Sequence, residues 1–121
     1  ASSRIYSSQD IERWHINEMK SLLSRFSGVK FIFDNVKQKY YPVLRDAITS
    51  FRSKNEGKPL VVIDDTPFID FDILDYPVND IEEIFLLKGS DAAIWGPKAS
   101  NGIIVIITQR GKSTKIEQKE E

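Results

Sequence analysis

The sequence predicts an α+β domain in which short helices partly cover a small mixed β-sheet. Three apolar runs, at residues 60–63, 84–87 and 103–108, have the composition of buried strands. The segments between them hold turn residues and short helical patterns, and no long periodic helix follows the first one. Strands that alternate with such short connections favour an α+β or open sandwich arrangement. The length of 121 residues fits one domain.

The N-terminal part begins with a periodic helix, predicted over residues 18–26. Its apolar positions have the i, i+3, i+4 and i+7 spacing of a helix that buries one face, and a short turn at residues 9–13 precedes it. Gly28 supplies the left-handed position that ends such a helix. The alternation of residues 29–33 predicts a short strand, whereas residues 35–42 are polar and aromatic and end in a proline, which favours a loop.

The middle of the chain is predicted as a strand, a loop and a hairpin. Residues 43–51 mix β-branched and polar side chains, which indicates a strand. Residues 53–59 carry no apolar side chain except proline, which is typical of a surface loop. After the buried strand 60–63, residues 64–67 have turn composition, and residues 68–69 are expected to form the returning arm of a hairpin.

The last third is predicted as two strands joined by a short helix. A helical turn at residues 80–83 leads into strand 84–87, and a short helix at residues 90–95 follows it. A further turn at residues 98–102 precedes strand 103–108. The residues expected to define turns are Gly28, Gly89, Gly96, Asn101 and Gly102.

Composition sets the domain boundary and excludes several classes of protein. Residues 1–111 are predicted to fold, and the charged segment 112–121 is predicted to be a mobile C-terminal tail. A formal net charge of −1 gives no one-sided field for nucleic acid or anionic lipid. No cysteine is present, which excludes thiolate nucleophiles and cysteine-ligated zinc. The longest apolar run, residues 103–107, is far shorter than the roughly 20 residues of a transmembrane helix.

The motifs predict no enzyme, no metal site and no cofactor site. The single histidine, His15, has no partners at the spacing of a catalytic or metal site. The glycines between residues 89 and 102 match neither a phosphate loop nor a dinucleotide fingerprint. The carboxylates of residues 64–75 are of the type that calcium accepts, but their spacing does not match an EF-hand, and acidic turns of this kind are ordinarily solvated.

One acidic and aromatic region and one tryptophan are expected to contact a ligand or a partner. Exposed aromatic rings can stack on a sugar or a peptide, although core packing also accounts for them. The candidate contacts are Asp65, Phe68, Asp70, Asp72 and Trp95.

An ordered series of motifs occupies the second half of the chain. They are PLVVIDDTP at residues 59–67, NDIEEIFLLKG at 79–89, AAIWG at 92–96 and ASNGIIVIITQRG at 99–111. This series resembles the plug domain of TonB-dependent outer-membrane receptors, and is most similar to the SusC-like receptors that import glycans and peptides in Bacteroidetes. Upstream, SQDIE at 8–12, LL at 22–23 and SGV at 27–29 resemble the looser start of the same domain.

The resemblance implies a non-catalytic domain of the bacterial outer membrane or periplasm. A plug occludes a β-barrel, contributes to substrate sensing and rearranges when an energy-transducing partner pulls on a preceding segment. The implied partners are an outer-membrane β-barrel or another envelope protein, together with a glycan or peptide ligand. No nucleic acid and no transmembrane helix are expected.

Three positions depart from the pattern of the family. Asp65 stands where plugs usually carry glycine, which leaves the type of that turn open. Ile94 and Trp95 replace a small residue and a tyrosine before Gly96. The arginine–glycine pair of the family's middle strand has no clear counterpart near residues 43–52.

The ends of the sequence leave two interpretations open. No segment like a TonB box precedes Ser7, and no run of barrel strands follows Gly111. The chain is therefore either a piece of a receptor or a plug-like module of a barrel-less periplasmic or surface protein that binds a ligand or another protein. The charged residues 112–121 favour the second interpretation.

Overall fold

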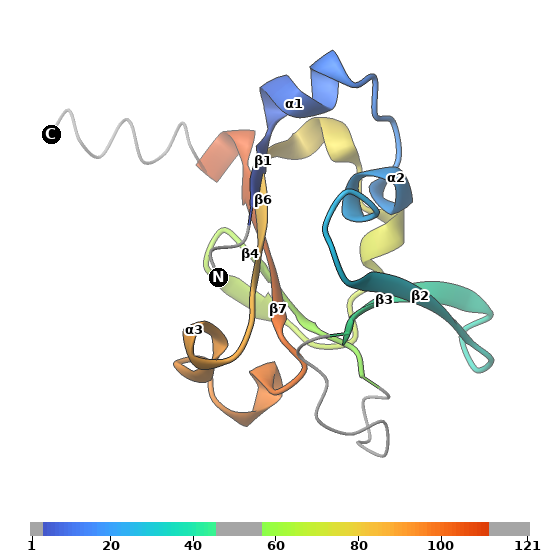
Figure 1. Ribbon diagram of the computed structural model, residues 1–121, viewed down its shortest axis with the longest axis vertical. Helices are drawn as coiled ribbons and strands as arrows, with labels where there is room; N and C mark the ends of the chain where they lie inside the picture. Colours follow the sequence, from blue (N-terminus) through green and yellow to red (C-terminus); the bar gives the residue numbers. More distant parts are fainter. Residues whose placement is uncertain (1–3, 46–56, 112–121) are drawn as a thin grey trace, which may run out of the picture.

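The computed structural model describes residues 4–45 and 57–111 (Figure 1). Five strands form one sheet in the order β1-β6-β7-β4-β5, and β2 and β3 form a separate two-stranded hairpin. The strands are β1 (Ile5–Ser7), β2 (Val29–Asp34), β3 (Lys39–Leu44), β4 (Leu60–Ile63), β5 (Thr66–Phe68), β6 (Ile81–Leu87) and β7 (Ile103–Thr108). The larger sheet is mixed, because β4 and β7 pair parallel and its other pairs are antiparallel. The predicted α+β class with a small mixed sheet is confirmed.

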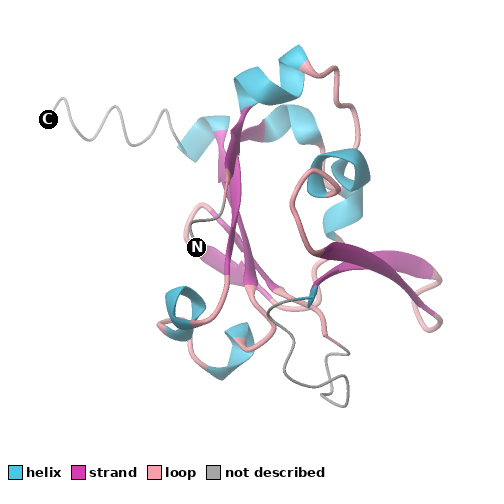
Figure 2. Cartoon of the chain, in the orientation of Figure 1, coloured by secondary structure: helices cyan, strands magenta, loops and turns pink. Residues whose placement is uncertain are grey.

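Short helices cover parts of the larger sheet (Figure 2). They are α1 (Ser8–Arg13), α2 (Met19–Leu23), η2 (Ile73–Asp75), η3 (Val78–Asp80), α3 (Ser90–Ala93) and η4 (Pro97–Ala99). The helix predicted over residues 18–26 is present as α2, but it ends at Leu23, whereas the short turn expected at residues 9–13 is the helix α1. Ser7 and Asp10 close a reciprocal capping box that fixes the start of α1. The helix predicted at 90–95 is shorter, because α3 covers four residues.

Strand β7 lies between β6 and β4, and its residues are buried on both faces of the sheet. Ile104 and Ile106 join the larger apolar cluster, which also includes side chains of α1 and α2. Ile103 joins a second cluster with Leu60 of β4 and Ala92 of α3. Burial on both faces explains why this strand is a continuous apolar run in the sequence.

The hairpin of β2 and β3 corrects the prediction of a loop over residues 35–42. The loop covers only the turn before Lys39, and β3 continues through Pro42 to Leu44. Pro42 pairs with Phe31 of β2. A proline is tolerated here because β3 pairs with a single strand among the described residues, so one edge needs no donor.

Strand β6 starts earlier than expected. The helical turn predicted at residues 80–83 lies at Val78–Asp80, and Ile81 already pairs with Thr108 of β7. A register shift between Ile81 and Glu83 marks a β-bulge, which disturbs the alternation that sequence reasoning relies on.

Some predictions fall outside the described residues. These include most of the strand predicted at 43–51, of which Val43 and Leu44 belong to β3. They also include the first part of the loop at 53–59 and the tail at 112–121. In residues 4–45 and 57–111, no helix combines the length and apolar character that crossing a bilayer would require.

Candidate ligand and partner site

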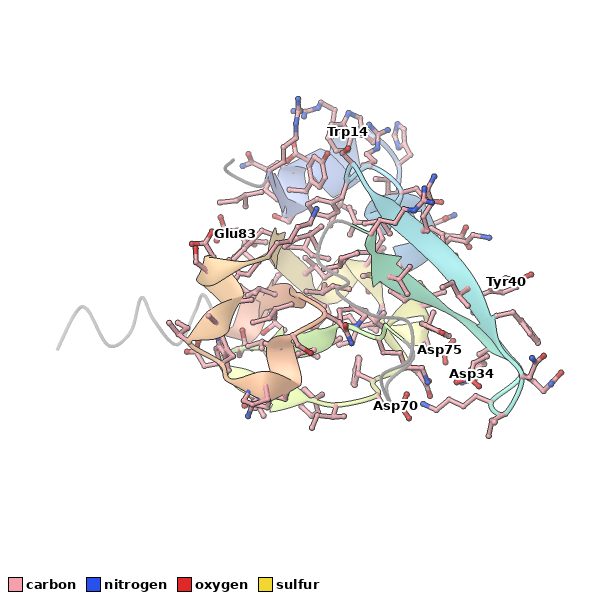
Figure 3. The ribbon with its side chains drawn as sticks, turned by 60° about the horizontal axis from the view of Figure 1, so that its bottom comes forward. Trp14, Asp34, Tyr40, Asp70, Asp75 and Glu83 are labelled. Atoms are coloured by element: carbon pink, nitrogen blue, oxygen red, sulfur yellow. The ribbon has the colours of Figure 1, made fainter. Side chains whose placement is uncertain are left out.

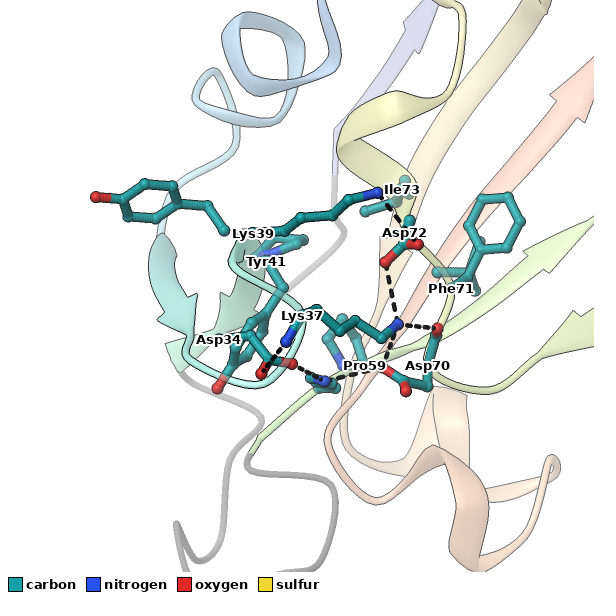
Figure 4. Close-up of a pocket in the computed structure, with 13 residues that line it drawn as sticks. Asp34, Lys37, Lys39, Tyr41, Pro59, Asp70, Phe71, Asp72 and Ile73 are labelled. Carbon is teal, nitrogen blue, oxygen red and sulfur yellow. Dashed lines mark hydrogen bonds and ion pairs between the residues drawn. The ribbon is translucent and has the colours of Figure 1, made fainter.

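A cleft lies between the β2–β3 hairpin and the segment that runs from Lys58 to Ile73 (Figure 4). We call it the hairpin cleft. Its cavity volume is about 20 Å³, which is room for little more than one water molecule, so a larger ligand would lie at its mouth. Its polar wall consists of Asp34, Lys37, Lys39, Lys58, Asp70 and Asp72. Tyr40, Tyr41, Pro42, Pro59, Val61, Phe71 and Ile73 form the rest.

Lys58 connects the hairpin to the larger sheet. Its ammonium lies 2.7 Å from Oδ2 of Asp34 and 2.8 Å from Oδ1 of Asp70. The side chain of Lys58 is only 16% exposed and that of Asp34 only 9%, so solvent screens this pair weakly. The ammonium also lies 4.9 Å from the centre of the Tyr41 ring. One cation therefore joins the end of β2, the start of β4 and the loop before η2.

Two more lysines extend the network along the mouth of the cleft. Lys37 Nζ lies 3.1 Å from Asp70 Oδ1 and 3.0 Å from Asp72 Oδ1, and it donates to the Asp70 carbonyl oxygen at 3.0 Å. Lys39 Nζ lies 3.5 Å from Asp72 Oδ2 and 2.7 Å from Asp75 Oδ2. These pairs are more exposed than that of Lys58, so each stabilises the fold less.

The lysines and aspartates of the network stabilise one another in their ionised forms. A hydrogen bond from Lys58 lowers the pKa of Asp34, and backbone N–H groups lower it further. The pKa of Asp70 is lowered by Lys58 and Lys37, and that of Asp72 mainly by Lys37. Burial alone would lower the pKa of Lys58, but its bonds to Asp34 and Asp70 outweigh burial and raise it.

Asp34 also builds the turn of the hairpin. Its Oδ1 accepts from the backbone N–H groups of Val36 at 2.9 Å and Lys37 at 3.2 Å, and its carbonyl oxygen accepts from that of Gln38 at 2.8 Å. Gln38 has a φ of 57°, the left-handed conformation that lets β3 return along β2. The same carboxylate thus shapes the turn and anchors it to Lys58.

The predicted contact residues are not brought together. Asp70 and Asp72 line the hairpin cleft, and the ring of Phe68 lies 5.3 Å from that of Phe71 in its wall. Asp65 lies in the β4–β5 turn, and Trp95 packs against the second apolar cluster on the other face of the sheet. Sequence reasoning did not identify the cleft residues Asp34, Lys37, Lys39 and Lys58. Their sequence signal is weak, since isolated charges in polar segments are ordinary surface residues.

Of the residues expected to define turns, the four glycines have backbone conformations that favour glycine, and Asn101 is buried. Gly28, Gly89, Gly96 and Gly102 all have positive φ values. Gly96, with φ 81° and ψ −168°, occupies a region that essentially only glycine reaches. Asn101 is 3% exposed, and its amide donates to the Lys58 carbonyl oxygen at 3.3 Å. It therefore supports the backbone from which Lys58 enters the cleft.

The side chains of the cleft can attach the hairpin to the rest of the fold and can bind a ligand. Every carboxylate of its wall has a lysine partner, and residues 4–45 and 57–111 contain no cluster of three or more histidine, aspartate or glutamate side chains arranged to hold a metal. Lysine, aspartate and tyrosine side chains beside a small apolar wall can hydrogen-bond a polar ligand while apolar contacts orient it.

Comparisons with known proteins agree with the motif series. The sequence profile of the TonB-dependent receptor plug domain matches residues 1–103. The fold is similar to part of the ferric enterobactin receptor of Pseudomonas aeruginosa, with a TM-score of 0.66 and 19% identity over 88% of this chain. The siderophore receptor PirA of Acinetobacter baumannii has a TM-score of 0.66 and 20% identity over 88% of this chain. PirA of Pseudomonas aeruginosa has a TM-score of 0.56 and 23% identity over 89% of this chain.

The chain spans only a small part of these receptors. It covers 17% of the first two and 18% of the third. At these identities the similarity supports the fold, and the profile match over most of the chain identifies the family. The chain belongs to the TonB-dependent receptor plug domain family.

Proposed function

We propose that this chain is the plug of a SusC-like outer-membrane receptor, where it occludes a β-barrel and takes part in TonB-driven nutrient uptake without catalysing a reaction. The observation that carries the proposal is that β4, β6 and β7, which hold the plug motifs, are neighbours in one mixed sheet. We further propose that residues 1–111 are the unit that sits in the barrel, with 112–121 as a separate tail.

The proposed location follows from the same family. A plug acts where its barrel is, so we place the chain at the bacterial outer membrane with one side open to the periplasm. Its mixture of acidic and basic surface groups, with a net charge of −1, suits a polar barrel lumen.

Occlusion is testable in the natural gene product that contains this chain. The intact protein and a version lacking residues 4–111 are inserted separately into planar bilayers, and ion conductance is recorded. We expect a closed intact protein and a large conductance after the deletion. Equal conductance in the two forms would contradict occlusion. A gene product that never inserts would instead identify a barrel-less module that binds a ligand or another protein.

For the ligand we propose a glycan or a peptide, bound partly at the mouth of the hairpin cleft. Its wall combines tyrosine rings with lysine and aspartate hydrogen-bonding groups, which suit a polar ligand without large net charge. A ferric siderophore is the second candidate, because the structures that share this fold include a ferric enterobactin receptor and siderophore receptors.

A growth experiment separates the two ligand classes. Cells that lack the receptor gene are compared with the parent on single glycans or peptides, and separately under iron limitation with added ferric siderophores. A defect confined to glycan or peptide growth supports our proposal, and a defect confined to iron-limited growth supports the siderophore. Tyr40→Ala, with Val36→Ala as a matched exposed control on the same hairpin, then tests the cleft. Only the first change should weaken uptake.

A further inference from the structure

A stack of one tryptophan and two arginines lies at the end of the molecule opposite the hairpin cleft. Trp14 follows α1, and its ring centre lies 3.8 Å from Cζ of Arg25 and 5.1 Å from Cζ of Arg13. Figure 3 shows Trp14 among nitrogen-bearing side chains, well away from Asp34 and Asp70 of the cleft. We call Trp14, Arg13 and Arg25 the arginine stack.

The core of the protein holds this stack in place. Tyr6 is 6% exposed, and its ring meets that of Trp14 edge-on with 5.5 Å between centres. The Tyr6 hydroxyl donates to the carbonyl oxygen of Arg25 at 2.8 Å, which fixes the backbone that carries the guanidinium. Both the ring and the cation are therefore pre-organised, so a ligand would order few side chains on binding.

The two arginines differ in whether an ion pair within the described part of the chain already engages the guanidinium. Arg13 is already paired with Asp10 of α1. In the part of the chain that the structure describes, Arg25 has no ion pair within 4.0 Å, and its side chain is exposed. A guanidinium that stacks on an aromatic face keeps its in-plane N–H donors, and their fork matches a carboxylate.

We propose that the arginine stack is a docking surface for an acidic segment of a partner protein, in which a glutamate or aspartate carboxylate pairs with Arg25 and adjacent atoms pack on Trp14. Tryptophan and arginine are the residue types that dominate the binding energy of interfaces. An anionic bilayer fits less well, because binding to lipid headgroups takes a cluster of several basic side chains, and Arg13 of this stack is already paired with Asp10. This surface is separate from the proposed barrel occlusion and ligand cleft.

The fluorescence of Trp14 reports binding directly. The chain has two tryptophans, so Trp95→Phe leaves Trp14 as the single reporter. This variant is titrated with a blocked hexaglutamate peptide and with hexaglutamine. We expect a saturable fluorescence change with hexaglutamate only, with an affinity that falls as salt rises. Calorimetry on the unaltered chain repeats the measurement without any substitution.

Substitutions at the stack identify the group responsible. Loss of one charge-assisted bond predicts a roughly 10-fold or larger loss of affinity for Arg25→Gln. Arg25→Lys keeps the charge but not the fork and should bind more weakly than the unaltered chain. Lys30→Gln removes an exposed cation of β2 and should change nothing. Equal losses in Arg25→Gln and Lys30→Gln would overturn the proposal.

Two further probes test the class of ligand. Inorganic phosphate at the same charge concentration should compete poorly with hexaglutamate. Competition as strong as that of the peptide would reduce the stack to a general anion site and overturn the proposal. Tighter binding to phosphatidylglycerol vesicles than to the peptide would also overturn it, in favour of a membrane surface.

Discussion

At the scale of single residues, we expect the side chain of Lys58 to contribute more to stability than either neighbouring lysine, because its ion pair with Asp34 is less exposed than the pairs of Lys37 and Lys39. It holds Asp34, whose side chain is 9% exposed, and Asp70 at the same time. We expect Lys58→Met to lower the free energy of unfolding by about 1 to 2 kcal/mol. Two charged hydrogen bonds are lost, and the solvent at the mouth of the cleft softens the loss. Urea denaturation followed by circular dichroism measures the change.

Lys37→Met is the matched control for Lys58. The Lys37 side chain is 31% exposed, and its carboxylate partners face solvent, so its removal should lower stability less. If the two variants lose the same amount, the buried position of Lys58 has no special role.

The same charges predict how stability depends on pH. The folded pKa values of Asp34, Asp70 and Asp72 lie below those of the unfolded chain, so their contribution is complete above about pH 4 and is lost as pH falls through the folded values. The pKa values of Lys37, Lys39 and Lys58 are raised, so their contribution is complete below about pH 10 and is lost as pH rises through the folded values.

A plateau of stability between these limits is the expected result, measured as the urea midpoint at a series of pH values. Lys58→Met should flatten the acid side of the curve, because Asp34 and Asp70 lose the partner that lowers their pKa values. An unchanged acid slope in this variant would contradict the assignment.

At the scale of elements, the turn between β4 and β5 shows the consequence of having Asp65 at a position where plugs usually carry glycine. Ile63 pairs with Thr66, which leaves a two-residue loop, and both of its residues have positive φ: 47° at Asp64 and 70° at Asp65. A type I′ turn requires this combination and favours Asp-Gly. Asp65→Gly should therefore raise the free energy of unfolding by about 0.5 kcal/mol, since it relieves a left-handed conformation. Thermal unfolding tests this.

Asp64 provides the contrast within the same turn. Its carboxylate accepts from the backbone N–H and the hydroxyl of Thr108 at the end of β7. A Cβ on Gly111 would lie 2.3 Å from Asp64 Oδ1, so the chain after β7 closes tightly over this carboxylate. Asp64→Gly should lower stability by about 1 kcal/mol. If both glycine variants shift stability in the same direction, backbone strain and the Thr108 contact have not been separated correctly.

The elements that the sequence predicted well are those fixed by local apolar patterns. β4 and β7 have the predicted bounds, because burial on both sheet faces demands unbroken apolar runs. β3 was partly missed, because Pro42 and the polar residues before it resemble a loop, and only pairing with β2 makes them a strand. The hairpin cleft could not be predicted, because Lys58 and Asp34 are 24 residues apart and no local pattern joins them.

At the scale of the whole molecule, the structure combines two sheets held by different forces. The five-stranded sheet is fixed by apolar burial, with Ile104 and Ile106 of β7 fully buried. The β2–β3 hairpin reaches the apolar core at Val29 and Leu44, but its turn is attached to the rest of the protein through the lysine–aspartate network. Forces of these two kinds respond differently to salt, because ions screen charges and leave apolar burial intact.

Hydrogen exchange at low salt and at about 1 M sodium chloride, where the screening length is near 3 Å, should reveal the difference. We expect the amides of Val36, Lys37 and Gln38 in the hairpin turn to exchange faster at high salt, while those of Ile104 and Ile106 in β7 change little. The turn opens locally when its charges are screened, whereas β7 exchanges only through larger unfolding. In Lys58→Met the turn should already exchange fast at low salt and respond weakly to added salt. A uniform salt effect on the turn and on β7 would mean that both sheets open as one cooperative unit.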